Sequence, residues 1–207
     1  MRIIDISMQM YEGMPIYPEN PLLRIRPVKR VPENSSSISE IRMGSHTGTH
    51  IDTMLHISQG AGGIENIPLE DLVGPCQVVD LTHCDGEIKA EDLAAKKLKM
   101  NRVLLKTKNS VNRTDTFNRD FIHLSDEAAR YLADLGHIRT VGVDYLSIQK
   151  FHKGNQETHR ALLGMVTVIE GLVLDAARER RYELICLPLK IHGLDGVPAR
   201  AVLIERY

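Results

Sequence analysis

Three side chains that can bind a metal ion lie close together in the first third of the chain. His46, His50 and Asp52 belong to the stretch GSHTGTHID, which also holds two glycines and two threonines. Imidazole and carboxylate groups together suit Zn²⁺, with Mn²⁺ or Fe²⁺ as alternatives. Because no cysteine lies among them, the set is typical of a catalytic metal site, which keeps a position for water, rather than of a structural one.

The spacing of these residues indicates the local backbone. His46, His50, Asp52 and His56 fall on even positions, so an extended chain would place them on one face. A straight strand rises ~3.3 Å per residue, which would put His46 roughly 20 Å from Asp52, too far to share an ion. The chain must therefore bend, and Gly48 can adopt a positive φ without steric cost, leaving His50 and Asp52 on one face of a strand. A helix is disfavoured because Gly48 and the intervening β-branched residues are poor helix formers.

Two interpretations of the motif compete. In one, the Thr and His side chains satisfy backbone groups in a tight turn that Asp52 caps. The addition of Asp52 and His56 to the His-x₃-His pair favours the other, a metal site. Further ligands must then come from elsewhere, and the segment ETHRALLGMVTVIEGL offers His159 and Glu170. Glu170 ends an apolar run, so it either faces solvent or meets a cation. The remaining histidines are interpreted as structural or surface residues: His83, His123, His137, His152 and His192.

The overall composition predicts one domain over residues 1–207. A 23.3 kDa chain can bury a core without a disulfide or structural metal, so a bound metal would serve chemistry. The net charge of -1, spread along the sequence, indicates neither nucleic acid nor an anionic membrane as a partner. Three cysteines without C-x-x-C spacing fit a reducing, cytoplasmic setting. No apolar run is long enough for a membrane span, and we expect a soluble protein.

Short β-branched runs outnumber helical patterns and predict an α/β fold with a strand-rich mixed sheet and packed helices. The clearest helix covers 125–136, where Ser125 can cap the first turn and Gly136 can follow the last. A second helix is predicted over 90–99, and the Pro-rich segment 13–21 is expected to be an ordered loop. The predicted strands are 2–7, 37–43, 76–81, 102–107, 140–145, 166–170, 183–189 and 200–206.

These residues resemble the cyclase family of metal-dependent hydrolases, which includes bacterial kynurenine formamidase and isatin hydrolase. The sharpest element is H-x-G-T-H-x-D, here His46 to Asp52, followed by His56. Supporting segments are YPENP, NIPLEDLVGPCQVVDL, GVDYLSI, THRALL with IEGL, and LPLKIHGLDGVPARAVLI, so the resemblance covers most of the chain. It implies the swivelling β/β/α cyclase fold and a homo-oligomer, most simply a dimer.

The resemblance also implies roles for individual residues. The metal ligands would be His46, His50, Asp52, His159 and Glu170, with Asp52 bridging two ions, zinc being expected and manganese the alternative. His56 would donate or accept the proton, and Tyr17, in the early proline-rich loop, would contact a small-molecule substrate. The implied activity is hydrolysis of an amide C–N bond, with N-formylkynurenine as the leading substrate.

Alternatives remain at this point. One is a hydrolase of cyclic amides such as isatin, and another is a metal-dependent binding module without turnover. The sequence also departs from the formamidase pattern at three places. Tyr17 is followed by Pro-Glu-Asn where formamidases tend to have Trp before Pro-Gly-Asp, Met54 stands where many relatives have proline, and the spacing from His159 to Glu170 is one residue shorter.

Overall fold

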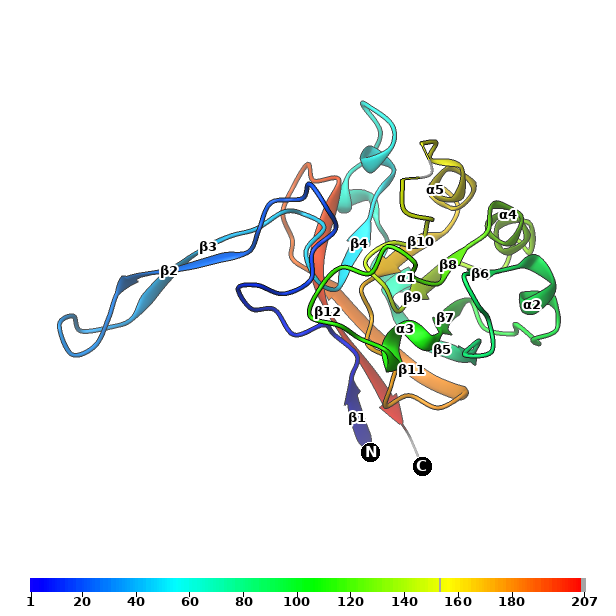
Figure 1. Cartoon of the computed structure of the whole chain (residues 1–207), viewed down its shortest axis with the longest axis horizontal. Helices are drawn as coiled ribbons and strands as arrows, with labels where there is room; N and C mark the ends of the chain where they lie inside the picture. Colours follow the sequence, from blue (N-terminus) through cyan, green and yellow to red (C-terminus); the bar gives the residue numbers. More distant parts are fainter. Residues whose placement is uncertain (153, 206–207) are drawn as a thin grey trace.

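The fold is built around one eight-stranded sheet, seen in a computed structural model that describes residues 1–152 and 154–205 (Figure 1). The strands lie in the order β1-β12-β11-β5-β7-β9-β10-β4, and β4 also pairs with β12, which closes the sheet into a barrel-like form. The strands of this sheet are β1 (Arg2–Asp5), β4 (His50–Asp52), β5 (Val73–Asp80), β7 (Arg102–Lys106), β9 (Thr140–Val143), β10 (Thr167–Glu170), β11 (Arg180–Pro188) and β12 (Gly196–Glu205). The strand-rich mixed α/β architecture expected from the sequence is confirmed.

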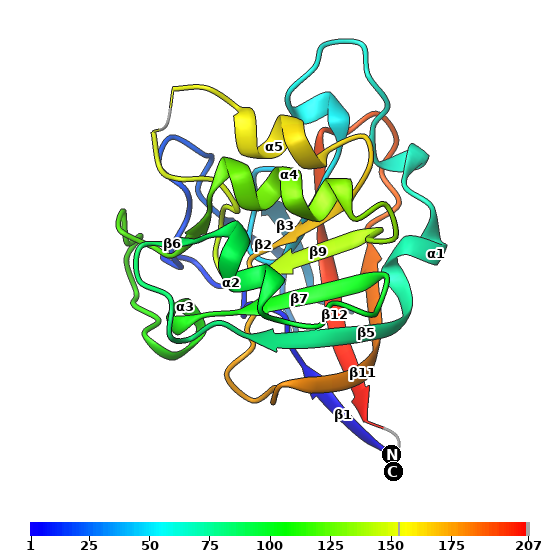
Figure 2. The same ribbon diagram turned by 90° about the vertical axis from the view of Figure 1, so that its right-hand side faces the viewer.

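The centre of the sheet is parallel. Strands β5, β7, β9 and β10 pair in parallel with one another, whereas β4, β11, β12 and β1 pair antiparallel with their neighbours. Residues 102–105 of β7 and all of β9 and β10 are buried, as expected for strands covered on both faces. Figure 2 shows α2, α4 and α5 lying across one face of these parallel strands.

The helices are short, and the longest follows its capping signals. Helix α4 covers Asp126–Asp134; the Ser125 side chain accepts a hydrogen bond from the amide of Ala128, and Gly136 has a φ of 66°. The helix predicted over 90–99 is shorter in the structure, because α2 ends at Ala94. The other helices are α1 (Leu69–Leu72), α3 (Lys108–Val111) and α5 (Glu157–Leu162), with 3₁₀ turns η1 (Met54–His56) and η2 (Ile64–Asn66).

Two apolar cores flank the parallel strands. One lies between the sheet and the helices and includes Val103, Leu105 and Leu132. The other lies on the opposite face and includes Ile51, Leu104 and Leu203, which come from strands distributed around the barrel-like sheet. Alternate residues of β7 thus serve different cores, as the two-residue period of a strand requires. The closing strand β4 is tied into the second core through Ile51.

All eight predicted strand segments contain strands, with shifted ends, and Arg206 lies outside the described residues. The segment 13–21 has no helix or strand, as predicted. Three strands were missed: β2 (Arg24–Lys29), which pairs with β3 (Ile38–Arg42) of the predicted segment 37–43, and β6 (Glu87–Ile88) with its partner β8 (His123–Leu124). Among the described residues, none of the helices combines the length and apolar character needed to cross a bilayer.

Candidate metal centre

The bend predicted at Gly48 brings the two halves of the histidine motif together. Gly48 has a φ of 65°, and the strand β4 begins at His50. In the antiparallel pairing of β4 with β10, His50 lies directly opposite Glu170. This register explains why a carboxylate that ends an apolar run is buried: Glu170 is only 3% exposed and points toward imidazole groups. The sequence left that orientation open.

Four buried side chains converge at this point. The Nε2 atom of His50 lies 3.3 Å from Asp52 Oδ1 and 3.3 Å from Glu170 Oε2. The Nε2 atom of His159, on α5, lies 3.5 Å from Asp52 Oδ2 and 3.3 Å from Glu170 Oε1. Two carboxylates and two imidazoles thus alternate around a common centre. The predicted association of these four residues is therefore present in the structure.

The separations fit ligands of an ion better than hydrogen-bonded pairs. Good N–H···O bonds have N···O distances near 2.9 Å, whereas two ligands held tetrahedrally at ~2.0–2.1 Å from Zn²⁺ lie roughly 3.3–3.4 Å apart. The buried atoms His50 Nε2 and Asp52 Oδ2 have no hydrogen-bond partner within the described protein. Since buried polar atoms are rarely left unpaired, a cation between them accounts for both.

The tautomer of His50 also suits a ligand. Its Nδ1 lies 2.9 Å from the carbonyl oxygen of Gly48, which can only accept a hydrogen bond. Nδ1 therefore carries a proton, so that loss of the proton on Nε2 when a metal binds would leave the Nε2 lone pair directed at the centre. The same glycine that bends the chain thus also orients the imidazole.

A second group of possible ligands adjoins the first and shares Asp52 with it. His46 Nδ1 lies 2.9 Å from Asp52 Oδ1, and the His46 ring is 4.2 Å from the ring of His56. Ligand atoms of these three residues lie within 4.8 Å of one another, as do those of His50, Asp52 and Glu170. Asp52 is therefore positioned between two sets of donors, and it is the residue that could bridge two ions.

Asp195 is a carboxylate of this region that the sequence analysis did not identify. Its Oδ2 lies 3.1 Å from His46 Nε2 and 3.9 Å from His56 Nδ1. The pairing of β4 with β12 brings it here, because Gly196 lies opposite Asp52. Gly196 has no room for a side chain, since a Cβ there would lie 2.4 Å from the His46 ring. The only signal in the sequence was an Asp before a glycine in the loop leading to the last strand.

The charged side chains of the centre raise the pKa values of His50 and His159 and lower that of Asp52. Burial disfavours the charged forms of His50 and His159, but contacts with Asp52 and Glu170 outweigh it and raise the pKa of each imidazole to about 10. Burial would raise the pKa of Asp52, yet the surrounding imidazoles hold it well below its usual range. For His56, burial is the dominant cause and lowers the pKa, so this imidazole is neutral at pH 7 and can accept a proton.

The centre opens into a cavity of about 170 Å³ whose wall includes the predicted substrate contact, Tyr17. The Tyr17 ring is half-buried, and burial raises the pKa of its hydroxyl, which is therefore neutral at pH 7. Phe117 and Phe151 pack against Tyr17 with ring centroids at 5.2 and 5.6 Å. The cavity is lined by Tyr17, Asn20, His46, His50, His56, Leu146, Ser147, Gln149, Lys150, Gln156, His159 and Glu170.

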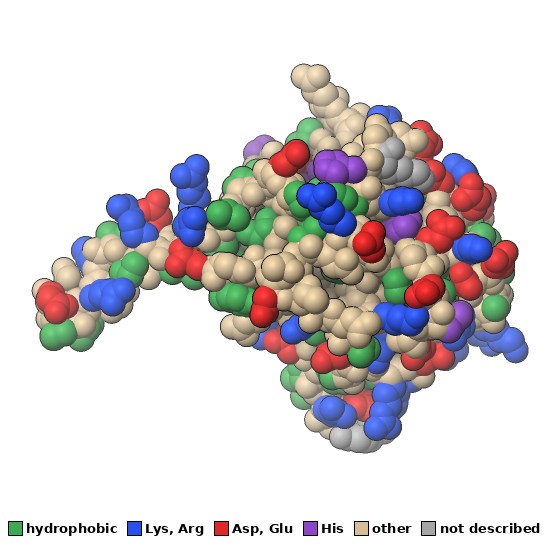
Figure 3. All heavy atoms as spheres, viewed as in Figure 1, with side chains coloured by type: hydrophobic (Ala, Val, Ile, Leu, Met, Phe, Trp, Pro, Cys, Tyr) green, Lys and Arg blue, Asp and Glu red, His purple; other side chains and the backbone are tan. Residues whose placement is uncertain are grey.

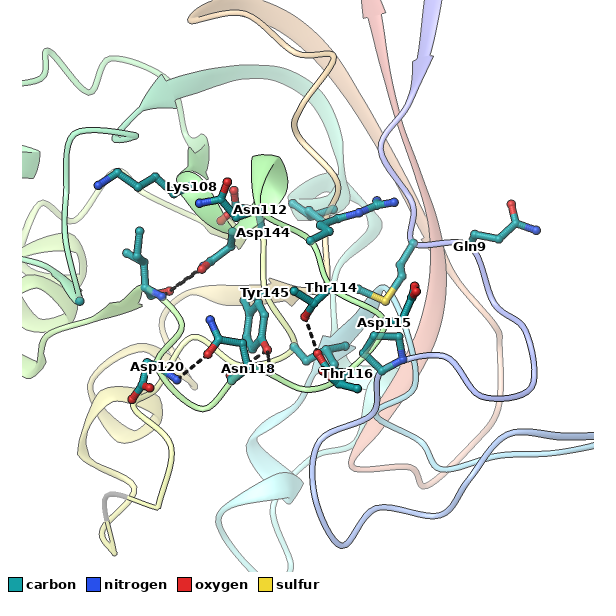
Figure 4. Close-up of a pocket in the computed structure, with 18 of the residues that line it drawn as sticks. Gln9, Lys108, Asn112, Thr114, Asp115, Thr116, Asn118, Asp120, Asp144 and Tyr145 are labelled. Atoms are coloured by element: carbon teal, nitrogen blue, oxygen red, sulfur yellow. Dashed lines mark hydrogen bonds between the residues drawn. The ribbon is translucent and has the colours of Figure 1, made fainter.

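A larger cavity, of about 300 Å³, lies beyond Leu146, which lines both (Figure 4). Asp144 at its wall accepts hydrogen bonds from Thr107 and Ser110, and the Tyr145 hydroxyl both donates to and accepts from the backbone of Asn118. These polar groups are already paired, and no histidine lines this cavity. The four histidines of the centre instead line the smaller cavity.

The chain is similar to known proteins over nearly its whole length. A family model described as putative cyclase matches residues 4–150. A kynurenine formamidase from Salinibacter ruber is 34% identical, with 98% of this chain and 97% of the relative covered. A kynurenine formamidase from Bordetella avium is also 34% identical, with 99% and 98% covered.

Solved structures share the fold. One described as a potential metal-dependent hydrolase with cyclase activity has a TM-score of 0.87 and 42% identity, covering 100% of this chain and 98% of that one. Isatin hydrolase A from Labrenzia aggregata, bound to benzyl benzoate, has a TM-score of 0.83, with 98% and 93% covered. Its 22% identity supports a common fold and no more.

Proposed function

The chain belongs to the cyclase family, and from this premise we propose that it is a metal-dependent amidohydrolase that hydrolyses N-formyl arylamines, with N-formylkynurenine as the leading substrate. The proposal rests on one observation above all: His50 Nε2 and Asp52 Oδ2 are buried without partners in a centre of imidazoles and carboxylates. Full-length similarity to kynurenine formamidases supports the choice of substrate.

Five residues would hold the metal. We propose that two Zn²⁺ ions bind, with Asp52 bridging them, and that Mn²⁺ can replace Zn²⁺ because the donors are nitrogen and oxygen only. A bound ion of this kind supplies Lewis acidity, which lowers the pKa of a water molecule and polarises a carbonyl. The ligands would be His46, His50, Asp52, His159 and Glu170.

The chain's own residues would move the proton and orient the substrate. Hydrolysis adds water across the amide: an O–C bond forms at the formyl carbon, the C–N bond breaks, and a proton from water ends on the nitrogen. His56 would accept that proton and return it to the leaving nitrogen, and its lowered pKa keeps it neutral and ready to accept at pH 7. Asp195, near His56 Nδ1, would orient the ring.

An aromatic substrate suits the cavity wall. Tyr17 lines the cavity, and the rings of Phe117 and Phe151 pack against its ring. A ring packed against Tyr17 would gain about 0.5–1.5 kcal/mol beyond area burial. Tyr17→Ala should therefore raise KM roughly 2–12-fold with little change in kcat. Tyr11→Ala, at an exposed tyrosine outside this cavity, is the matched control and should leave KM unchanged.

The deciding experiment is a substrate panel. Protein loaded with zinc or manganese should release kynurenine and formate from N-formylkynurenine, lose the activity with a chelator, and regain it with added metal. Other formanilides and isatin should be assayed alongside. Turnover of isatin but not of any formanilide would contradict the formamidase proposal in favour of a cyclic amide hydrolase. If nothing in the panel reacts, the metal-dependent binding module gains ground.

A further inference from the structure

The segment that follows β9 lies against the metal centre. Ser147 and Gln149 line the cavity of the centre, and Gln149 is only 6% exposed. Ile148, between them, is fully buried in the core on the helix side of the sheet, and its carbonyl oxygen accepts a hydrogen bond from the backbone amide of Leu124. Because the segment is fixed in this way, the polar groups that it carries have defined positions relative to the centre.

The first of these polar groups orients Glu170. The backbone amide of Ile148 donates a hydrogen bond of 2.6 Å to Glu170 Oε1. Hydrogen bonds to a carboxylate are short and strong, so this one fixes the orientation of the side chain. The other oxygen, Oε2, lies 3.3 Å from His50 Nε2. Glu170 thus receives its orientation from a backbone group rather than from a side chain.

The second polar group is the side-chain amide of Gln149. Its Nε2 donates a hydrogen bond of 2.7 Å to the backbone carbonyl oxygen of Asn155, which can only accept. This contact establishes which end of the amide is the nitrogen. The oxygen, Oε1, then lies 3.4 Å from His159 Nδ1. Since an amide oxygen only accepts, Nδ1 carries a proton, and Nε2 of the same ring faces Asp52 and Glu170.

Burial makes the contact with Gln149 important for His159. The residue is 4% exposed, and Gln149 Oε1 is the partner of its Nδ1 among the described residues. Figure 3 shows histidine only as small separate patches, so the imidazoles of the centre are not displayed as a cluster on that face. A buried N–H group needs an acceptor within the protein. At His50 the carbonyl oxygen of Gly48 is that acceptor, whereas at His159 it is a side chain, which substitution can remove.

We propose that Gln149 is a positioning residue of the metal centre, whose Oε1 holds the His159 ring so that Nε2 is presented to the metal. The inference rests on the proposed metal-dependent function. Partners of the outer nitrogen of a metal-bound imidazole typically contribute about 10–100-fold to metal affinity. Because Nε2 of Gln149 also holds Asn155, the same side chain connects the loop before α5 to a ligand that lies on α5.

The test measures zinc affinity and needs no turnover. Gln149→Leu removes the acceptor and keeps a side chain of similar size. Competition with a chromophoric chelator should show a Kd raised about 10–100-fold for one of the bound zinc ions. Gln77→Leu is the matched control, because Gln77 also bridges two backbone groups, those of Lys97 and Lys99, and lies outside the cavity of the centre. Its zinc Kd should equal that of the wild type.

Nuclear magnetic resonance supplies a readout that a general loss of stability does not reproduce. In zinc-loaded protein with isotope-labelled histidine, the Nδ1 protons of His50 and His159 should each give a signal protected from exchange with water, because both are buried and hydrogen-bonded. Gln149→Leu should abolish the protection of the His159 signal and leave that of His50 unchanged.

Two further variants keep the test decisive. Gln149→Glu retains an acceptor toward Nδ1 and should bind zinc at least about tenfold more tightly than Gln149→Leu. Gln149→Met, which is unbranched and has no amide, repeats the measurement if circular dichroism shows that the leucine variant misfolds. The inference is overturned if the folded leucine or methionine variant binds zinc as tightly as the wild type, or if it binds no less tightly than Gln149→Glu.

Failure of the proposed function gives a different result. Wild-type protein that binds zinc but hydrolyses no formamide would contradict the proposed substrate, and the zinc affinities and imidazole signals of the Gln149 variants would still decide the inference. A change in KM alone, with wild-type zinc affinity, would place Gln149 on the substrate and overturn its positioning role. Wild-type protein that binds no zinc would contradict the proposed function and the inference together.

Discussion

Two groups of potential metal ligands in this chain differ in what surrounds them. The centre at Asp52 and the group of His83, Cys84 and Asp92 both bring ligand atoms within 4.8 Å of one another. In the second group, however, the His83 side chain is 60% exposed and that of Asp92 is 23% exposed. The side chains of His50 and Asp52 are each 1% exposed.

In the group of His83, Cys84 and Asp92, called the outer group below, the potential ligand atoms have interactions that do not need a metal. Asp92 Oδ2 accepts a hydrogen bond from the backbone amide of Lys89 at the start of α2. Burial raises the pKa of the Cys84 thiol to about 11, which disfavours the thiolate form that binds metals. The central group instead leaves buried atoms unpaired, at His50 Nε2 and Asp52 Oδ2. Closeness of donors alone is thus a weak sign of a metal site, and at Asp52 it is joined by buried donor and acceptor atoms that have no hydrogen-bond partner.

The largest effect is expected from removing the shared carboxylate. Asp52→Ala should reduce bound metal from about two ions per chain to a trace and bring turnover to background, because Asp52 contacts both sets of donors. Elemental analysis of freshly purified protein measures the first quantity, and the formamide assay the second. Retention of wild-type metal content in Asp52→Ala would mean that the ions bind elsewhere, the His83 group included.

Removing His56, the proposed proton carrier, should have a smaller effect than Asp52→Ala and should reduce turnover without loss of metal. His56→Ala is expected to lower kcat by ~10²–10⁴, the range for a general acid–base group, with metal content unchanged. His192→Ala, whose side chain is 89% exposed, is the control and should behave as wild type. Full turnover by His56→Ala would contradict the proposed role of this residue.

The metal-free protein should lose stability as the pH rises. His50 and His159 have folded-state pKa values of about 10 against 6.5 for the free side chain. Their contribution to the free energy of unfolding is therefore fully present below pH ~6.5 and is lost as the pH rises through ~10. The Tm of the chelated protein should fall between pH 7 and pH 10.

The same shifts predict a release of protons when metal binds. Zinc binding at pH 7 should release about two protons from His50 and His159. Calorimetry in buffers of different ionisation enthalpy measures that release; zinc binding without it would contradict the assignment of these histidines as ligands.

The smallest effect is expected at the outer group. His83→Ala should leave the metal content unchanged and should change turnover by no more than about twofold. The His83 ring lies largely in solvent and outside the cavity that opens from the metal centre. A drop in zinc content by one ion per chain would show that exposed donors suffice here, and would remove the distinction between the two groups. The measurement pairs naturally with Asp52→Ala, since the two variants should differ in every readout.

The sequence predicted local structure correctly where interactions between neighbouring residues determine it. The cap at Ser125, the bend at Gly48 and the buried strands such as 102–106 follow from side-chain propensities and hydrophobic period. The helix over 90–99 was too long because its second half holds three lysines and offers only Leu98 as a large apolar side chain for the core. The strand β2 was missed because Pro27 argues against a strand, although an unpaired edge tolerates proline.

The candidate ligands follow from the sequence alone, because H-x-G-T-H-x-D limits the donor types and its spacing requires a bend, which Gly48 permits. Only the tertiary structure decided that Glu170 points inward and that Asp195 reaches His46, since both depend on β4 pairing simultaneously with β10 and β12. Pairings between residues more than a hundred positions apart leave no local pattern. These pairings depend on burial of the whole sheet, and the pattern of neighbouring residues carries no information about it.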